Sequence, residues 1–77
     1  MSQYRVLIDA NDEIGLVHKV STVFFNNNLN ILSNHEFVDK ESNKFFMRSV
    51  LDGDIDKNKL INEIKNVLPS NAGVKIV

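Results

Sequence analysis

Seventy-seven residues with a formal net charge of −1 and no cysteine leave room for one small domain with a thin core. The near-zero charge argues against a general polyanion binder, and the missing cysteines exclude disulfides and cysteine-based zinc sites. No apolar run approaches the ~20 residues of a membrane span, and the first residues lack a signal-peptide apolar stretch. We therefore expect a single cytoplasmic domain over residues 1–77, with no membrane or nucleic-acid partner.

The first half of the chain predicts a strand followed by a helix. Apolar residues alternate over residues 4–10, which is typical of a central strand. Residues 11–13 predict a helix start, with a capping side chain and acids in the first turn, and Gly15 falls inside that turn. An apolar helical face follows, formed by Leu16, Val20, Val23 and Phe24. The asparagines at 26–28 end the helix, because Asn tolerates the left-handed conformation of a C-cap.

The middle of the chain predicts two strands, over residues 30–38 and 44–51, joined by a polar turn at 39–43. Phe45 and Phe46 are adjacent in the second of these strands, so their side chains point to opposite faces of the sheet. We expect Phe45 to lie in the core and Phe46, with Arg48, on the other face.

The last third predicts a second helix and a final strand. Asp54 or Asp56 can cap the helix, and Pro69 stops it. The apolar face of this helix consists of Leu60, Ile61, Ile64, Val67 and Leu68. Gly73 opens the final strand, which extends to Val77.

The resulting order is β-α-β-β-α-β, an α+β chain of the ferredoxin-like type. Right-handed crossovers place both helices on one face of a four-stranded antiparallel sheet. The other face of the sheet then needs water-tolerant side chains or a partner.

Most chemical functions find no support in the residue pattern. His18 and His35 have no His or Cys neighbour at ligand spacing, so we expect no metal and no cofactor. No nucleophilic triad or acid pair stands out, so no catalytic residue is assigned, and the acids of residues 11–15 would repel a phosphate. A single-stranded RNA-binding module remains a remote alternative, because Tyr4, Phe45 and Phe46 could stack on bases.

The loop between the first strand and helix offers a candidate ligand site. Gly15 has no Cβ, so a ligand could approach the free N–H groups of the helix start. A small amino acid fits this chemistry, with its carboxylate on those donors and its ammonium group on Asp12. The alternative is that Gly15 only permits tight packing of the helix on a strand.

The same loop resembles a known family. The pattern Asp12-x-x-Gly15-Leu16-Val17 at the first strand-to-helix junction is similar to that of ACT domains, small regulatory modules of metabolic enzymes. Three further segments resemble the N-terminal ACT domain of bacterial formyltetrahydrofolate deformylases: Asn30-Ile31, Asn34-x-Glu36-Phe37-Val38-Asp39 and Phe45-Phe46-Met47-Arg48.

The resemblance implies a regulatory rather than a catalytic role for this chain. Deformylases of this kind hydrolyse 10-formyltetrahydrofolate to formate and tetrahydrofolate, which supplies formate for purine biosynthesis. Their chemistry belongs to a formyltransferase-like catalytic domain, which is absent from these 77 residues and onto which the ACT domain would dock. The alternative is a free-standing ACT protein that binds an amino acid or a protein partner.

The resemblance also implies a homodimer with a ligand site at its interface. Glycine and methionine are the candidate ligands. The candidate binding residues are Asn11, Asp12, Gly15 and Leu16 of one copy, facing Asn30 and Ile31 of the other. Asn11 departs from the family, which usually has proline there, so we expect a less rigid loop.

Overall fold

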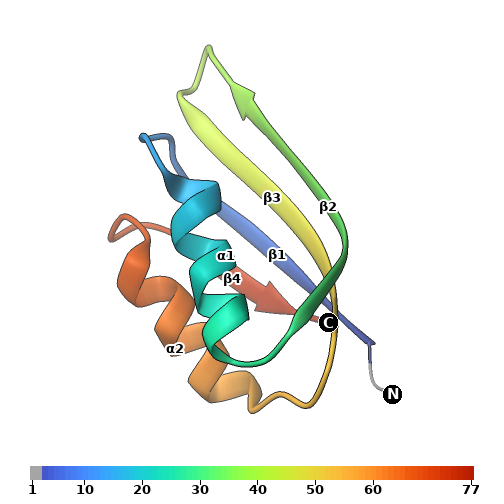
Figure 1. Cartoon of the computed structure of the whole chain (residues 1–77). Coiled ribbons are helices and arrows are strands. Elements are labelled where there is room, and N and C mark those ends of the chain that lie inside the picture. Colours follow the sequence, from blue (N-terminus) through green and yellow to red (C-terminus); the bar gives the residue numbers. More distant parts are fainter. Residues whose placement is uncertain (1–2) are drawn as a thin grey trace.

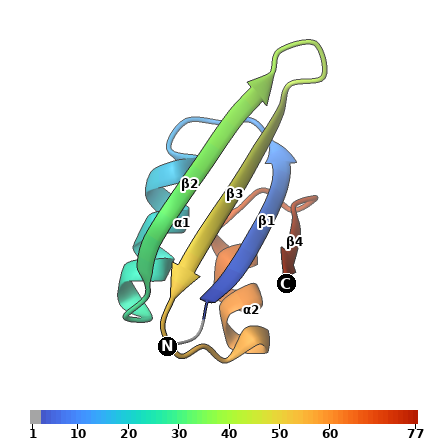
Figure 2. The same ribbon diagram turned by 90° about the vertical axis from the view of Figure 1, so that its right-hand side faces the viewer.

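The computed structural model describes residues 3–77, so Met1 and Ser2 of the predicted domain lie outside the described residues. Its elements are β1 (Gln3–Asn11), α1 (Leu16–Asn26), β2 (Asn30–Asp39), β3 (Lys44–Asp52), α2 (Lys57–Val67) and β4 (Gly73–Ile76). The sheet order is β2-β3-β1-β4 and all neighbouring strands are antiparallel. Both helices cover one face of the sheet, and the opposite face carries no helix from residues 3–77 (Figures 1 and 2). The predicted ferredoxin-like fold is confirmed.

The core lies between the helices and the sheet. Strand alternation and helical spacing bring its residues together, as predicted, and the most completely buried large side chains are Phe24, Leu51, Leu60, Ile64, Val6 and Val20. Fewer residues of α2 are fully buried than the sequence predicts, because Ile61 and Val67 on its apolar face are only half-buried. No helix formed by residues 3–77 is long and apolar enough to cross a membrane.

The start of α1 differs from the prediction. The helix begins at Leu16, its N-cap is Gly15 with φ 86°, and its first turn contains no acid. Asn11 is still the last residue of β1, and the amide of Asp12 donates a hydrogen bond to the carbonyl oxygen of Asn43 at 2.9 Å. Pairing with β3 therefore holds this segment outside the helix, and the left-handed Gly15 makes the turn into α1.

The other predicted helix boundaries are confirmed. Asn28, just beyond α1, has φ 58°, the left-handed conformation that ends the helix. The side chain of Asp56 caps α2 and accepts a hydrogen bond from the amide of Lys59 at 3.2 Å. Leu68 is already extended, as expected for a residue that precedes proline, here Pro69.

Candidate functional site

The start of α1 borders a hollow on the helix-covered side of the sheet, which we call the α1 hollow. It has a volume of about 300 Å³ and lies between the start of α1 and the β2–β3 hairpin. The residues that line it are Asp12, Glu13, Gly15, Leu16, Val17, His18, Glu36, Val38 and Phe45.

The structure brings only part of the predicted site together. Asp12, Gly15 and Leu16 line the α1 hollow, whereas Asn11 does not. Asn30 and Ile31 lie at the opposite end of β2, eight and seven residues before Val38, which is roughly 25 Å along an extended strand. Within one chain the two halves of the predicted site are therefore far apart.

Gly15 is needed for its backbone and not for close packing. A Cβ built on Gly15 meets no atom within 4 Å, so the helix–strand packing alternative is wrong. Its φ is 86°, a left-handed conformation that residues with a side chain rarely adopt. The open space above it means that a ligand could reach the backbone at the start of α1.

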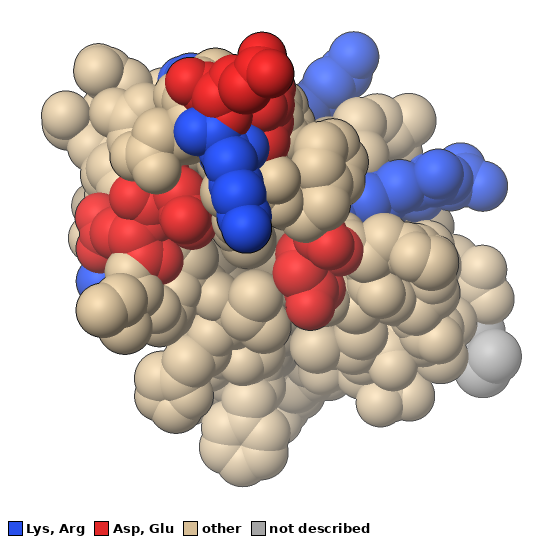
Figure 3. All heavy atoms as spheres, turned by 90° about the horizontal axis from the view of Figure 1, so that it is seen from above, with Lys and Arg blue, Asp and Glu red and all other residues tan. Residues whose placement is uncertain are grey.

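The charges around the α1 hollow are mostly acidic. Lys19 Nζ lies 2.9 Å from Glu13 Oε2, which offsets one carboxylate. Asp12 and Glu36 are not in a salt bridge with any residue of the described chain. In the same hollow, the first amides of α1 have no side-chain cap, so they remain available to an anion. Seen from this end of the molecule, acidic and basic side chains lie next to one another (Figure 3).

Sequence reasoning missed several residues of this hollow, including Glu36, Val38 and His18. Strand alternation carries the signal that finds two of them. Phe37 pairs with Phe46 on the open face, so Glu36 and Val38 must point to the helix side. No group of three or more His, Cys, Asp or Glu within residues 3–77 is arranged to hold a metal ion.

Comparison with known families assigns the chain. Residues 4–69 match the family described as the ACT domain. The chain belongs to the ACT domain family. Curated relatives of this ACT domain are much longer proteins. It is 36% identical over 72 residues to the formyltetrahydrofolate deformylase of Haemophilus influenzae. The alignment covers 94% of the ACT domain and 26% of that relative. The chain is also 33% identical over 61 residues to the formyltetrahydrofolate deformylase of Escherichia coli K12. That alignment covers 79% of this chain and 22% of the relative.

Solved structures show the same fold. The formyltetrahydrofolate deformylase from Burkholderia mallei superposes with a TM-score of 0.85 at 20% identity, covering all of the ACT domain and 28% of that chain. An ACT domain protein from Streptococcus pneumoniae gives a TM-score of 0.77 at 25% identity and is covered over 86% of its length. The chain thus spans about a quarter of the deformylases that it matches.

Proposed function

We propose that this chain is the regulatory ACT domain of a formyltetrahydrofolate deformylase that acts in the cytoplasm. The observation that carries the proposal is the 36% identity over 94% of the chain to one such deformylase. In this proposal the chain has no catalytic residue. It docks on a separate catalytic domain that hydrolyses 10-formyltetrahydrofolate to formate and tetrahydrofolate, and the formate supplies purine biosynthesis.

The gene provides the first test of this proposal. A reading frame that continues beyond Val77 into a formyltransferase-like domain is the expected result. The long protein should then hydrolyse 10-formyltetrahydrofolate, and glycine or methionine should change its rate. A stop codon directly after Val77, with no deformylase in complex with the chain, would contradict the assignment.

The α1 hollow is the proposed amino-acid site. At about 300 Å³ it is large enough for a ligand of the size of glycine or methionine. The carboxylate would accept hydrogen bonds from the uncapped amides of α1, and the ammonium group would lie between Asp12 and Glu36. Apolar atoms of Val38 and Phe45 would contact the side chain of a ligand such as methionine.

Homodimerisation through β2 is the proposed way to complete this site. The strand is an edge of the sheet, and its exposed apolar side chains are Ile31, Leu32, Phe37 and Val38. Such an edge is a template for antiparallel pairing with a second copy. If the two-fold axis passes near Ser33 and Asn34, the partner's Ile31 lies beside Glu36, at the rim of the α1 hollow. This geometry joins the two halves of the predicted site.

Light scattering coupled to size-exclusion chromatography tests the dimer. We expect twice the chain mass at ~100 μM, because apolar edge strands of this kind associate readily. Substituting Ile31→Lys should shift the mass toward the monomer. The matched control is Val77→Lys, which adds the same charge at an exposed valine just beyond β4, on the far edge of the sheet. A wild-type monomer at this concentration would rule the dimer out.

Calorimetric titration with glycine and methionine tests the ligand. Gly15→Val should abolish binding, since Gly15 lines the hollow and valine adds bulk beside the uncapped amides of α1. Asp12→Asn should weaken binding by about tenfold through loss of an ammonium partner. Asp54→Asn is the control, because it removes an exposed carboxylate at the other end of the molecule. No heat with either amino acid at ~10 mM would leave the domain with an assembly role alone.

The second candidate is a free-standing ACT protein that binds an amino acid or a protein partner. It is favoured by the Streptococcus pneumoniae ACT domain protein, of which this chain covers 86%. The two candidates differ in their complexes. A free-standing protein would bind its amino acid and co-purify with no deformylase, whereas the deformylase proposal requires a deformylase catalytic domain on the same polypeptide or in complex with the chain.

A further inference from the structure

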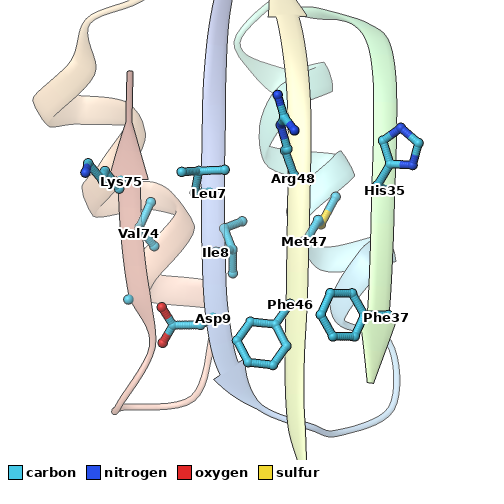
Figure 4. A pocket seen from close by; sticks show the side chains of 11 residues that line it. Leu7, Ile8, Asp9, His35, Phe37, Phe46, Met47, Arg48, Val74 and Lys75 are labelled. Atoms are coloured by element: carbon cyan, nitrogen blue, oxygen red, sulfur yellow. The ribbon is translucent and has the colours of Figure 1, made fainter. Parts of the chain in front are cut away.

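The open face of the sheet, opposite the helices, holds a second and larger hollow of about 580 Å³. We call it the open-face hollow. The strand register arranges its side chains in two neighbouring rows across the sheet. One row consists of Lys75, Leu7, Arg48 and His35, and the next of Gly73, Asp9, Phe46 and Phe37 (Figure 4).

Two aromatic rings form the apolar wall of this hollow. Phe37 and Phe46 stack with their centroids 5.0 Å apart and their planes inclined by 24°. Phe37 is nevertheless 63% exposed, and Leu7 beside the pair is 37% exposed. An aromatic ligand could lie against this wall and cover apolar surface that now faces water.

The neighbouring row provides cationic groups. Arg48 and Lys75 have no salt-bridge partner among residues 3–77, and both line the hollow. Arg48 follows Phe46 by two residues on β3, so the two side chains share a face at a spacing of about 7 Å. On β2, His35 likewise lies two residues from Phe37 and on the same face of the sheet. The aromatic pair and the cationic side chains are therefore close enough for one small ligand to contact both.

The single acid of this hollow is turned aside. A Cβ on Gly73 would lie 2.7 Å from Asp9 Oδ2, so the carboxylate occupies the place above Gly73, next to β4. Figure 4 shows it pointing away from Phe46. The path from the aromatic pair to Arg48 is therefore free of negative charge.

We propose that the open-face hollow binds a small aromatic carboxylate, with its ring against Phe37 and Phe46 and its carboxylate beside Arg48 and Lys75. The volume is in the range of small-molecule sites. The charged lining, two cations against one displaced acid, is complementary to an anion. It also opposes a second copy of the same face, which would bring like charges together. RNA platforms use separate aromatics on adjacent strands, but here both rings stack on each other and β1 presents Leu7 and Asp9.

Titration calorimetry with 3-phenylpropionate, which carries one ring and one carboxylate on a short linker, tests the proposal on the 77-residue chain. We expect one site per chain and shifts of the Phe37 and Phe46 ring protons in NMR spectra. Arg48→Gln should weaken binding by about tenfold and Phe46→Leu by about fivefold. Lys40→Gln is the control, because it removes an exposed cation in the hairpin turn that does not line the hollow.

Two comparison ligands separate the contributions: benzamide has the ring without the carboxylate, and glutamate has carboxylates without a ring. Both should bind at least tenfold more weakly than the probe. The proposal is overturned if the probe gives no binding at ~10 mM, if benzamide binds equally well, or if Arg48→Gln behaves as Lys40→Gln does. Binding of oligouridylate in place of the probe would assign the face to nucleic acid instead. A chain-mass doubling that Arg48→Gln abolishes would assign it to a second copy.

This inference does not rest on the amino-acid site, because the two hollows lie on opposite faces of the sheet. Gly15→Val should abolish the response to glycine and methionine while the aromatic carboxylate still binds. Loss of one response with retention of the other therefore shows which proposal has failed.

Discussion

Two glycines with positive φ should respond differently to alanine. At Gly15, φ is 86° and a Cβ meets nothing within 4 Å, so Gly15→Ala adds only backbone strain. That strain costs about 1–2 kcal/mol, and the stiffer unfolded chain offsets about 0.4–1 kcal/mol of it. We expect a net loss of about 1 kcal/mol in the free energy of unfolding, or roughly 4–8 °C in Tm.

At Gly53, φ is 143° and a Cβ would lie 2.9 Å from Leu29 Cδ2 and 3.4 Å from the carbonyl oxygen of Asn28. Strain and overpacking then add, and Gly53→Ala should cost about 3 kcal/mol. Urea unfolding followed by circular dichroism measures both variants. Gly15→Asn is the matched control, because Asn tolerates left-handed φ and should cost less than Gly15→Ala. The reasoning is refuted if Gly15→Ala costs as much as Gly53→Ala.

Three further substitutions test the packing and the caps. Phe24→Ala leaves a cavity at a fully buried position and should lower the free energy of unfolding by about 3–5 kcal/mol. This is a large share of the ~4–12 kcal/mol expected for the whole domain, so the urea midpoint should fall. Asp56→Ala removes the cap on the Lys59 amide and should cost about 1 kcal/mol in the same assay; an unchanged midpoint would mean that water replaces the cap. Gly73→Ala crowds Asp9 Oδ2 at 2.7 Å, so adding Asp9→Ala should relieve its cost, and an additive double-mutant cycle would contradict that contact.

The fold was predictable from the sequence because its signals are local and agree with one another. Alternation in β1 and helical spacing in α1 each specify a buried face, and those faces can be covered only by packing the helices on the sheet. The start of α1 was not predictable from the same kind of signal. Acids before an apolar run usually mark a helix start, but pairing of Asn11 with Lys44 keeps that segment in the sheet. A long-range contact thus overrode a local preference.

The candidate site was predictable only where one segment supplies it. Asp12, Gly15 and Leu16 are close in sequence and line one hollow. Glu36 enters that hollow from β2, and finding it requires the strand register in addition to the residue pattern. Ile31 would reach the same hollow only in the proposed dimer, and a second copy is something that the register of one chain does not specify.

The alternation of β3 explains how so small a domain can present two separate surfaces. Phe45 is buried and lines the α1 hollow, whereas Phe46, the next residue, forms the wall of the open-face hollow. The backbone of the sheet lies between them, so occupation of one hollow does not sterically exclude occupation of the other. The proposed regulatory role would use such a separation, because a regulatory domain must receive a signal without losing contact with what it regulates. In this chain two consecutive residues of β3 provide this separation, because their side chains point to opposite faces of the sheet.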